Sequence, residues 1–270
     1  MNNALKQILL VNDDGINSPG LWAAAEALSE LGYVTVAAPR DQASSTGRSL
    51  PITSDGRIHK VKLQVGAQEW EAYSVGGTPA QTTLHGVLEL TPRKPDLVVA
   101  GINYGENVGD GVTISGTVGA AMEAASMGIP ALAMSLQLVN HDFYGYSREV
   151  DFSTAAYFTR YFAKMLLENR MPQDVGVLKV EVPATATPKT AWRLTRQAVY
   201  RYFESRPTRT GSLEDSAPIG YNLVLDWDKI APDTDLYALL HDQVVAVTPL
   251  SLDLTSRVDF KAFELELKSR

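Results

Sequence analysis

The chain has 270 residues, carries a net charge of −7 at pH 7 and contains no cysteine. Its acidity argues against binding of a nucleic-acid duplex, which needs a basic surface, and the missing cysteine excludes a thiolate nucleophile, a disulfide framework and cysteine-based metal centres. No apolar run approaches the roughly 18 residues that a membrane span needs, and the first residues lack the pattern of a signal peptide. We therefore expect a globular cytoplasmic protein without membrane contact, large enough for one α/β domain.

The first predicted strand ends in two adjacent carboxylates. Residues 8–11 are four consecutive aliphatic residues, as in a strand that is buried on both faces of a parallel sheet. Asn12, Asp13, Asp14 and Gly15 follow directly, at the edge where open α/β sheets bind their ligands. The same residues are common turn formers, so a plain strand-to-helix turn and a site for a divalent cation both fit this stretch by itself.

The next segment completes a βαβ unit, which predicts two parallel strands. Ser18 and Pro19 are a typical helix cap and first helical residue, apolar residues recur at helical spacing, and Gly32 ends the helix before a strand at 33–37. A polar loop, 39–49, leaves this second strand at the same sheet edge as the carboxylates. Its small hydroxyl residues fit a surface loop, but they also fit a hydroxyl ligand or an anion-binding loop.

The middle of the chain predicts a hairpin, a helix and a third buried strand. Residues 57–65 and 69–75 alternate polar and apolar side chains around a turn, and a Gly-Gly-Thr-Pro sequence then begins a helix whose buried face we expect at Leu84, Val87 and Leu88. The strand at 96–102 runs into a loop rich in Gly and Asn. This loop lacks the glycine spacing of a dinucleotide-binding fingerprint, so a nicotinamide or flavin cofactor is not expected.

A helix of small residues, 118–127, follows Ser115, Gly116 and Thr117. An ordinary helix cap explains these three residues, and so does an anion site, because glycine at a helix start lets an anion approach the exposed N–H groups. A strand at 131–135 follows the helix.

The remaining elements are a helix, several strands and an extended polar segment. We expect a helix at 152–169 capped by Asp151, a strand at 175–182, an alternating strand at 192–203, strands at 221–225 and 244–248, and a terminal helix at 260–267. The segment 205–218 fits either a hairpin arm that exchanges with a partner subunit or a mobile surface loop.

Three loops are thus expected to meet at one crevice, because the carboxyl ends of parallel strands share one sheet edge. They carry Asp13 and Asp14, residues 44–47, and residues 103–117, and they offer carboxylate, hydroxyl and amide oxygens. The four histidines, His59, His85, His141 and His241, lie outside these loops. An all-oxygen site favours the hard cations Mg²⁺, Mn²⁺ or Ca²⁺ over zinc.

Six motifs in order along nearly the whole chain resemble the SurE nucleotidases (survival protein E). They are Asn12 to Gly15, Ala38-Pro39 followed by Ser44 to Gly47, Gly76 to Ala80, Gly101 to Asn107, Ser115 to Glu123, and Val247 to Leu250. The resemblance implies a Rossmann-like, mostly parallel three-layer αβα fold within a single SurE-like domain. It implies a core at about 1–185 and a C-terminal extension of hairpin and helix at 186–270 that forms homodimers or homotetramers.

The resemblance also implies a divalent-metal-dependent phosphomonoesterase that hydrolyses nucleoside 5′- and 3′-monophosphates. Its metal ligands would be Asp13, Asp14, Ser44 and Asn103, holding one Mg²⁺ or Mn²⁺, with Ca²⁺ as a further occupant. The phosphate pocket would be lined by Thr46, Gly47, Asn107, Ser115, Gly116 and Thr117.

The expected chemistry follows from these residues. The cation would lower the pKa of a bound water and polarise the phosphoryl group. Asn107 and the N–H groups of 115–117 would stabilise the phosphoryl oxygens, and Asp13 or Asp14 would orient or deprotonate the water. A broad phosphatase or short-chain exopolyphosphatase on the same site, and a non-catalytic nucleotide-binding module, remain as alternatives. A covalent aspartyl-phosphate mechanism fits less well, because it generally needs two aspartates separated by one residue.

The chain departs from the family pattern at four positions. The family usually has Asp at Gln81 and Ser at Ala100 and Ala246, and some members place a histidine thought to assist catalysis near Arg257. None of these positions is an expected metal ligand. The departures therefore bear on substrate preference and on a histidine general acid.

Overall fold

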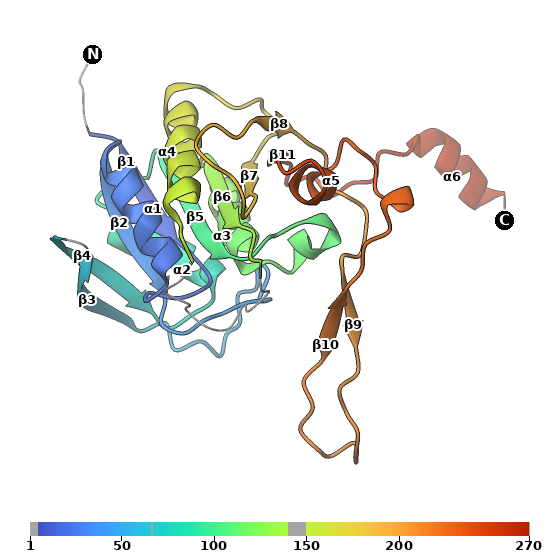
Figure 1. Ribbon diagram of the computed structural model, residues 1–270, viewed down its shortest axis with the longest axis horizontal. Helices are drawn as coiled ribbons and strands as arrows, with labels where there is room; N and C mark the ends of the chain where they lie inside the picture. Colours follow the sequence, from blue (N-terminus) through green and yellow to red (C-terminus); the bar gives the residue numbers. More distant parts are fainter. Residues whose placement is uncertain (1–4, 66, 140–149, 270) are drawn as a thin grey trace.

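A central nine-stranded sheet dominates the computed structural model, which describes residues 5–65, 67–139 and 150–269 (Figure 1). The strand order is β3-β4-β2-β1-β5-β6-β7-β11-β8. The strands are β1 (Gln7–Val11), β2 (Tyr33–Pro39), β3 (Ile58–Val65), β4 (Gln68–Val75), β5 (Leu97–Tyr104), β6 (Ala131–Leu136), β7 (Val177–Val182), β8 (Trp192–Leu194) and β11 (Val245–Leu250). Only the β3–β4 and β7–β11 pairings of this sheet are antiparallel, so the expected mostly parallel α/β class is confirmed.

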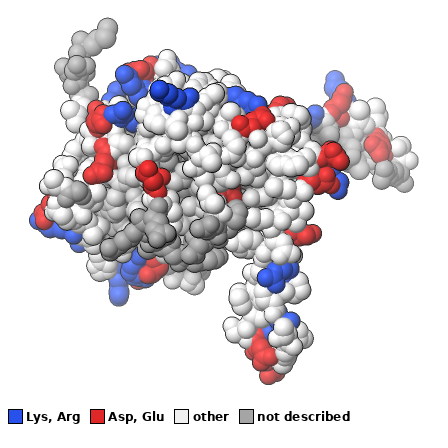
Figure 2. Space-filling model, viewed as in Figure 1, with Lys and Arg blue, Asp and Glu red and all other residues white. Residues whose placement is uncertain are grey.

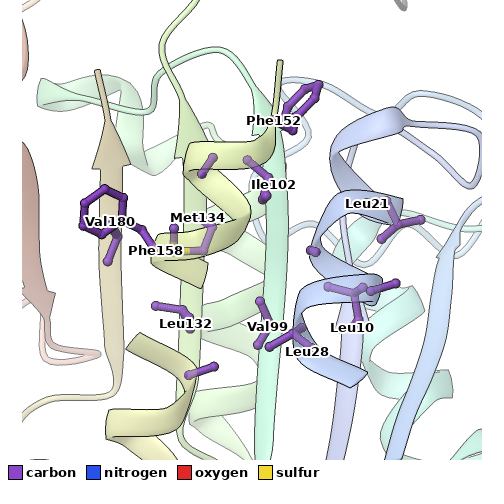
Figure 3. Close-up of a cluster of buried hydrophobic side chains, with 14 of the residues drawn as sticks. Leu10, Leu21, Leu28, Val99, Ile102, Leu132, Met134, Phe152, Phe158 and Val180 are labelled. Carbon is purple, nitrogen blue, oxygen red and sulfur yellow. The ribbon is translucent and has the colours of Figure 1, made fainter. Parts of the chain in front are cut away.

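Helices cover both faces of the sheet and complete the three layers. On one face, α1 (Pro19–Ser29) and α4 (Ser153–Glu168) pack on the strands through Leu21, Leu28 and Phe158, which meet Leu10 and Met134 of the sheet in one buried cluster (Figure 3). The opposite face is covered by α2 (Pro79–His85) and α3 (Gly116–Ser126). The apolar spacing that predicted the first helix thus identifies the side that it buries.

The predicted buried face of α2 is only partly confirmed: Leu84 and Val87 are half-buried, and Val87 packs against the core cluster on that side, but Leu88 is exposed. Leu88 is 68% exposed, and the α-helix ends at His85, followed by a π-helical turn, η1 (Gly86–Leu90). Ala80 and Thr83 are buried instead, and a Cβ on Gly86 would lie 2.6 Å from Leu9 Cδ2. Small residues therefore face β1, and they let this segment pack closer to the strand than leucine side chains at the same positions would allow.

The predicted alternating strand at 192–203 is divided between two sheets. Its first residues form β8 beside β11, whereas its end begins β9 (Phe203–Arg206), which pairs with β10 (Gly220–Leu223). The chain turns between them, where Arg196 binds Asp233 with Nε–Oδ2 at 2.6 Å. The hairpin β9–β10 projects from the sheet as an arm, and Figure 2 shows acidic side chains at its end.

A short 3₁₀ helix, η2 (Gly109–Thr113), follows β5. The rest of the C-terminal part contains η3 (Trp227–Lys229), α5 (Asp235–Leu240) beside β11, and α6 (Phe260–Lys268). All residues of α6 are exposed, and Figure 1 shows this helix apart from the sheet. Within the described part of the chain, no helix is long and apolar enough to cross a membrane.

Candidate metal and phosphate site

The parallel pairing of β1 with β2 and β5 brings three loops to one edge of the sheet. The side chain of Asn12 closes the first loop: its Nδ2 donates to the Gly15 carbonyl at 3.0 Å, and its Oδ1 accepts from Gly15 N at 3.2 Å. Asp13 and Asp14 stand in this turn and are only 4% and 2% exposed. The turn and the predicted carboxylate site are therefore one feature, in which the turn positions the carboxylates.

Asp13 lies against the N-terminus of α3. Thr117 Oγ1 donates a short hydrogen bond to Asp13 Oδ1, and it also lies 3.2 Å from Asn103 Oδ1. Burial raises the pKa of Asp13 from its usual 3.8 to about 6, although the hydrogen bonds from Thr117 and Gly116 lower it. A Cβ on Gly116 would lie 2.8 Å from Asp13 Oδ2, so the close approach of helix and carboxylate requires glycine.

Asp14 is held by the other two loops. Its Oδ2 accepts from Tyr104 N at 3.0 Å, and its Oδ1 lies 3.4 Å from Gln42 Nε2. The same Gln42 amide donates to Ser44 Oγ at 3.1 Å. Burial raises the pKa of Asp14 well above its usual value, and the charge of Asp13 raises it further.

The four expected metal ligands therefore form two hydrogen-bonded pairs, which the adjacent residues Asp13 and Asp14 bring together in one cluster. Thr117 connects Asp13 with Asn103, and Gln42 connects Asp14 with Ser44. Among the described residues, no three His, Cys, Asp or Glu side chains form a metal-binding group, so hydroxyl and amide oxygens would have to complete a site here. Two carboxylates, a hydroxyl and an amide oxygen are a donor set that fits a hard divalent cation.

A bulge in β5 places Asn103 in this cluster. The register of β5 against β6 shifts between Ala100 and Asn103. Gly101, inside the shift, has φ +128°, and a Cβ there would lie 2.3 Å from the Met134 carbonyl oxygen. Only glycine fits this position. The register shift points the Asn103 side chain in a different direction from the one it would have in a regular strand.

In the expected phosphate pocket, the hydroxyl groups of Ser115 and Thr46 already bind other parts of the protein, which leaves backbone N–H groups as the donors for a phosphate. Ser115 Oγ accepts from Val118 N at 3.1 Å as the cap of α3, and Thr46 Oγ1 donates to the Ala43 carbonyl at 2.7 Å. Gly47 N donates to the Ile114 carbonyl at 2.9 Å, which fixes the loop of Thr46 and Gly47 beside the start of α3. The prediction that Ser115 caps a helix is thus confirmed. The alternative prediction, an anion site, stays a prediction about the backbone N–H groups near Ser115.

Asn107 stands on the other side of the loop after β5. Its Nδ2 donates to Ser135 Oγ at 3.0 Å, at the end of β6. Its backbone N–H donates to Glu181 Oε2 at 2.9 Å, and its carbonyl accepts from Lys179 Nζ at 2.8 Å. These hydrogen bonds connect Asn107 to β6 and β7.

Three residues that contact the expected site residues were not predicted from the sequence: Gln42, Lys179 and Glu181. Gln42 has one usable signal, its position two residues before Ser44 in the same loop. The pair on β7 gives no such signal, since Lys and Glu at alternate positions of a strand are typical of an exposed face.

The histidines and the departures from the family pattern lie outside this cluster. His59 is on β3, His85 ends α2, and His141 lies outside the described residues. Gln81 is the third residue of the α2 capping box: its Oε1 accepts from Thr78 N at 3.0 Å. Arg257 is exposed in the segment before α6.

Comparison with known proteins decides the family. The family model described as "Survival protein SurE" matches residues 8–204. The chain belongs to the SurE family. A protein of Thermococcus gammatolerans named 5′-nucleotidase SurE is 41% identical over 259 residues, covering 94% of this chain and 93% of its own. One of Archaeoglobus fulgidus with the same name is 40% identical over 260 residues, covering 96% of each chain.

A solved SurE structure has the same fold. The crystal structure of the SurE protein from Aquifex aeolicus matches with a TM-score of 0.75 and 32% identity, covering 97% of this chain and 99% of that one. The resemblance expected from the six motifs is therefore confirmed for both family and fold, and the SurE fold extends over nearly the whole chain.

Proposed function

We propose that this SurE protein is a divalent-metal-dependent phosphomonoesterase that hydrolyses nucleoside 5′- and 3′-monophosphates to nucleoside and phosphate. The observation that carries the proposal is the pair of adjacent buried carboxylates, Asp13 and Asp14, with Ser44 and Asn103 beside them. Like charges this close raise the free energy of the folded protein unless a cation is shared between them. Relatives that cover nearly the whole chain and are named 5′-nucleotidase support the reaction class.

The metal would be held by Asp13, Asp14, Ser44 and Asn103, with Mg²⁺ or Mn²⁺ as the expected ion and Ca²⁺ as a further occupant. When bound, such an ion supplies an activated water and polarises the phosphoryl group. Gln42 and Thr117 would hold these side chains in position for the ion, because each contacts one carboxylate and one of the two neutral residues, Ser44 or Asn103.

The chain's own groups would do the rest of the work on the phosphoryl group. Asn107 and the N–H groups at Ser115, Gly116 and Thr117 would stabilise charge on its oxygens, together with the loop of Thr46 and Gly47. Whichever of Asp13 and Asp14 the metal does not fully occupy would orient or deprotonate the attacking water.

The test is release of phosphate from nucleoside 5′- and 3′-monophosphates, generic phosphate esters and short polyphosphates, with Mg²⁺, with Mn²⁺ and with excess chelator. We expect release from the nucleotides, abolished by the chelator. Asp14→Asn should lower turnover by roughly 100-fold or more, because it removes a charge at the metal. Full activity in chelator, or a wild-type rate in Asp14→Asn, contradicts the metal site. Faster hydrolysis of polyphosphate than of any nucleotide contradicts the substrate class.

We also propose that the protein is a single domain that assembles as a homodimer or homotetramer in the cytoplasm. The extension at 186–270 divides in a way that supports assembly: β8 and β11 continue the core sheet, whereas the arm β9–β10 and α6 extend from it (Figure 1). Exposed apolar side chains on these two parts, Leu213, Ile219, Phe260 and Leu265, suit contact with a second subunit. Light scattering of the full chain tests this, with a monomer at micromolar concentration as the contrary result.

A further inference from the structure

A group of opposite charges is completely buried next to the proposed site. Lys179 and Glu181 of β7 and Asp235, the first residue of α5, are each 0% exposed. Lys179 Nζ lies 3.0 Å from Asp235 Oδ2 and 3.4 Å from Glu181 Oε1. Burial lowers the pKa of Lys179, but the two carboxylates outweigh burial, so its pKa stands above the usual range and the lysine is charged.

Glu181 and Lys179 hold both backbone polar groups of Asn107. Glu181 Oε2 accepts from Asn107 N at 2.9 Å, and Lys179 Nζ donates to the Asn107 carbonyl at 2.8 Å. Asp235 Oδ2 also lies 3.4 Å from the N–H of Gly109, two residues further along the same loop. Asn107 is thereby fixed on both sides by charged groups.

Asp235 connects this loop to the C-terminal extension. Its Oδ1 accepts from Ala198 N at 2.9 Å and from Leu236 N at 2.8 Å. The segment after β8 and the start of α5 therefore meet the Asn107 loop through one carboxylate. Sequence positions 107, 179 and 235 come together only because β7 and α5 are packed side by side.

Stability alone is a poor explanation for this group. Well-packed apolar residues in place of a buried ion pair are often neutral or stabilising, whereas removal of one partner is costly. Charges of this kind are useful where they fix one geometry, and here they fix the backbone of a single loop. We propose that Lys179, Glu181 and Asp235 are positioning residues that hold Asn107 against the phosphoryl group, so that the C-terminal extension supports the pocket. This inference rests on the proposed function.

Asp235→Asn is the informative change. Asparagine keeps the shape and an Oδ1 acceptor for Ala198 and Leu236, but it removes the charge that faces Lys179. We expect kcat to fall about 10-fold or more, with a smaller change in KM, because a small displacement of a transition-state contact is costly. Hydrogen–deuterium exchange of the peptide covering residues 105–112 should become faster, which reports loosening of the loop without any substrate. Glu181→Gln gives a second measure if Asp235→Asn does not yield folded protein.

Thr35→Val is the matched control. The Thr35 hydroxyl accepts from Gln7 Nε2 at 3.0 Å, a buried polar contact between β2 and β1 that involves neither the charged group nor the Asn107 loop. This substitution should lower stability and leave kcat and exchange of residues 105–112 as in the wild type.

A double-mutant cycle with Asn107→Ala separates the possible results. Positioning predicts that Asn107→Ala lowers kcat/KM strongly in the wild type and only slightly in Asp235→Asn. Equal losses in both backgrounds, or unchanged exchange of residues 105–112 in Asp235→Asn, overturn the inference and leave the group a structural one. If Asn107→Ala has a wild-type rate, the assignment of Asn107 under the proposed function fails instead.

Discussion

Replacing Asp13 by asparagine should remove a pH-dependent loss of stability from the metal-free protein. Burial raises the pKa of Asp13 from 3.8 to about 6. Below pH 3.8 the carboxyl is protonated in both states. As the pH rises towards 6, the unfolded chain releases this proton while the folded chain keeps it, so the free energy of unfolding falls. The fall is complete above pH 6.

The size of this effect follows from the same pKa. Each pKa unit corresponds to about 1.4 kcal/mol, so the rise from 3.8 to about 6 amounts to roughly 3 kcal/mol. The charge of Asp13 also raises the pKa of Asp14, and Asp13→Asn removes that contribution too. Asparagine presents an amide NH₂ near the N–H groups of α3, but this cost does not vary with pH.

Urea denaturation in excess chelator, from pH 3 to pH 7.5, measures the prediction. The wild type should lose roughly 3 kcal/mol more than Asp13→Asn across this range. Asp41→Asn, at an exposed carboxylate on a neighbouring loop, controls for loss of a charge and should follow the wild type. A constant difference between wild type and Asp13→Asn at every pH would refute the reasoning, because Asp13 would then titrate alike in both states.

Three further changes test separate parts of the site. Gly116→Ala places a Cβ 2.7 Å from Asp13 Cβ, so we expect about 1–3 kcal/mol of destabilisation in thermal unfolding and a turnover lowered on the order of 100-fold. Ser44→Ala should weaken Mn²⁺ binding about 10-fold in calorimetry with little change in stability, and unchanged affinity argues against Ser44 as a ligand. Gln81→Ala removes the capping-box acceptor of Thr78 N and should lower stability by about 1 kcal/mol with KM unchanged; a changed KM would instead connect Gln81 with substrate.

The mostly parallel arrangement of the core and the common sheet edge of its loops could be predicted because they depend on local patterns. Residues 8–11 are aliphatic at every position, so the strand had to be buried on both faces, and its connection through a helix had to be parallel. From there, the common edge of parallel strands brings Asp13, Ser44 and Asn103 together without knowledge of any side-chain contact.

The parts that could not be predicted depend on contacts between distant segments. Lys179 and Glu181 alternate with valine and leucine, a pattern that indicates one solvent-facing side, yet α5 and the Asn107 loop cover that side completely. Leu88 was expected to be buried because it is apolar, but Gly86 lets the helix approach β1 on another face. In each case the burial of a side chain depends on a segment that is distant in the sequence, so the local sequence pattern cannot predict it.

The two groups of buried charges should respond differently to a divalent cation, and this difference follows from their signs. Asp13 and Asp14 are alike in charge, so their burial favours protonated forms and binding of a cation would stabilise the folded state by mass action. In the other group, the protein itself supplies a positive charge, Lys179, to the carboxylates of Glu181 and Asp235, so this group needs no ion. Added Mg²⁺ should therefore raise the melting temperature of Asp235→Asn by as much as that of the wild type, and should fail to do so in Asp13→Asn. The proposed metal ligands and the residues proposed to position Asn107 can thus be distinguished before any substrate is added.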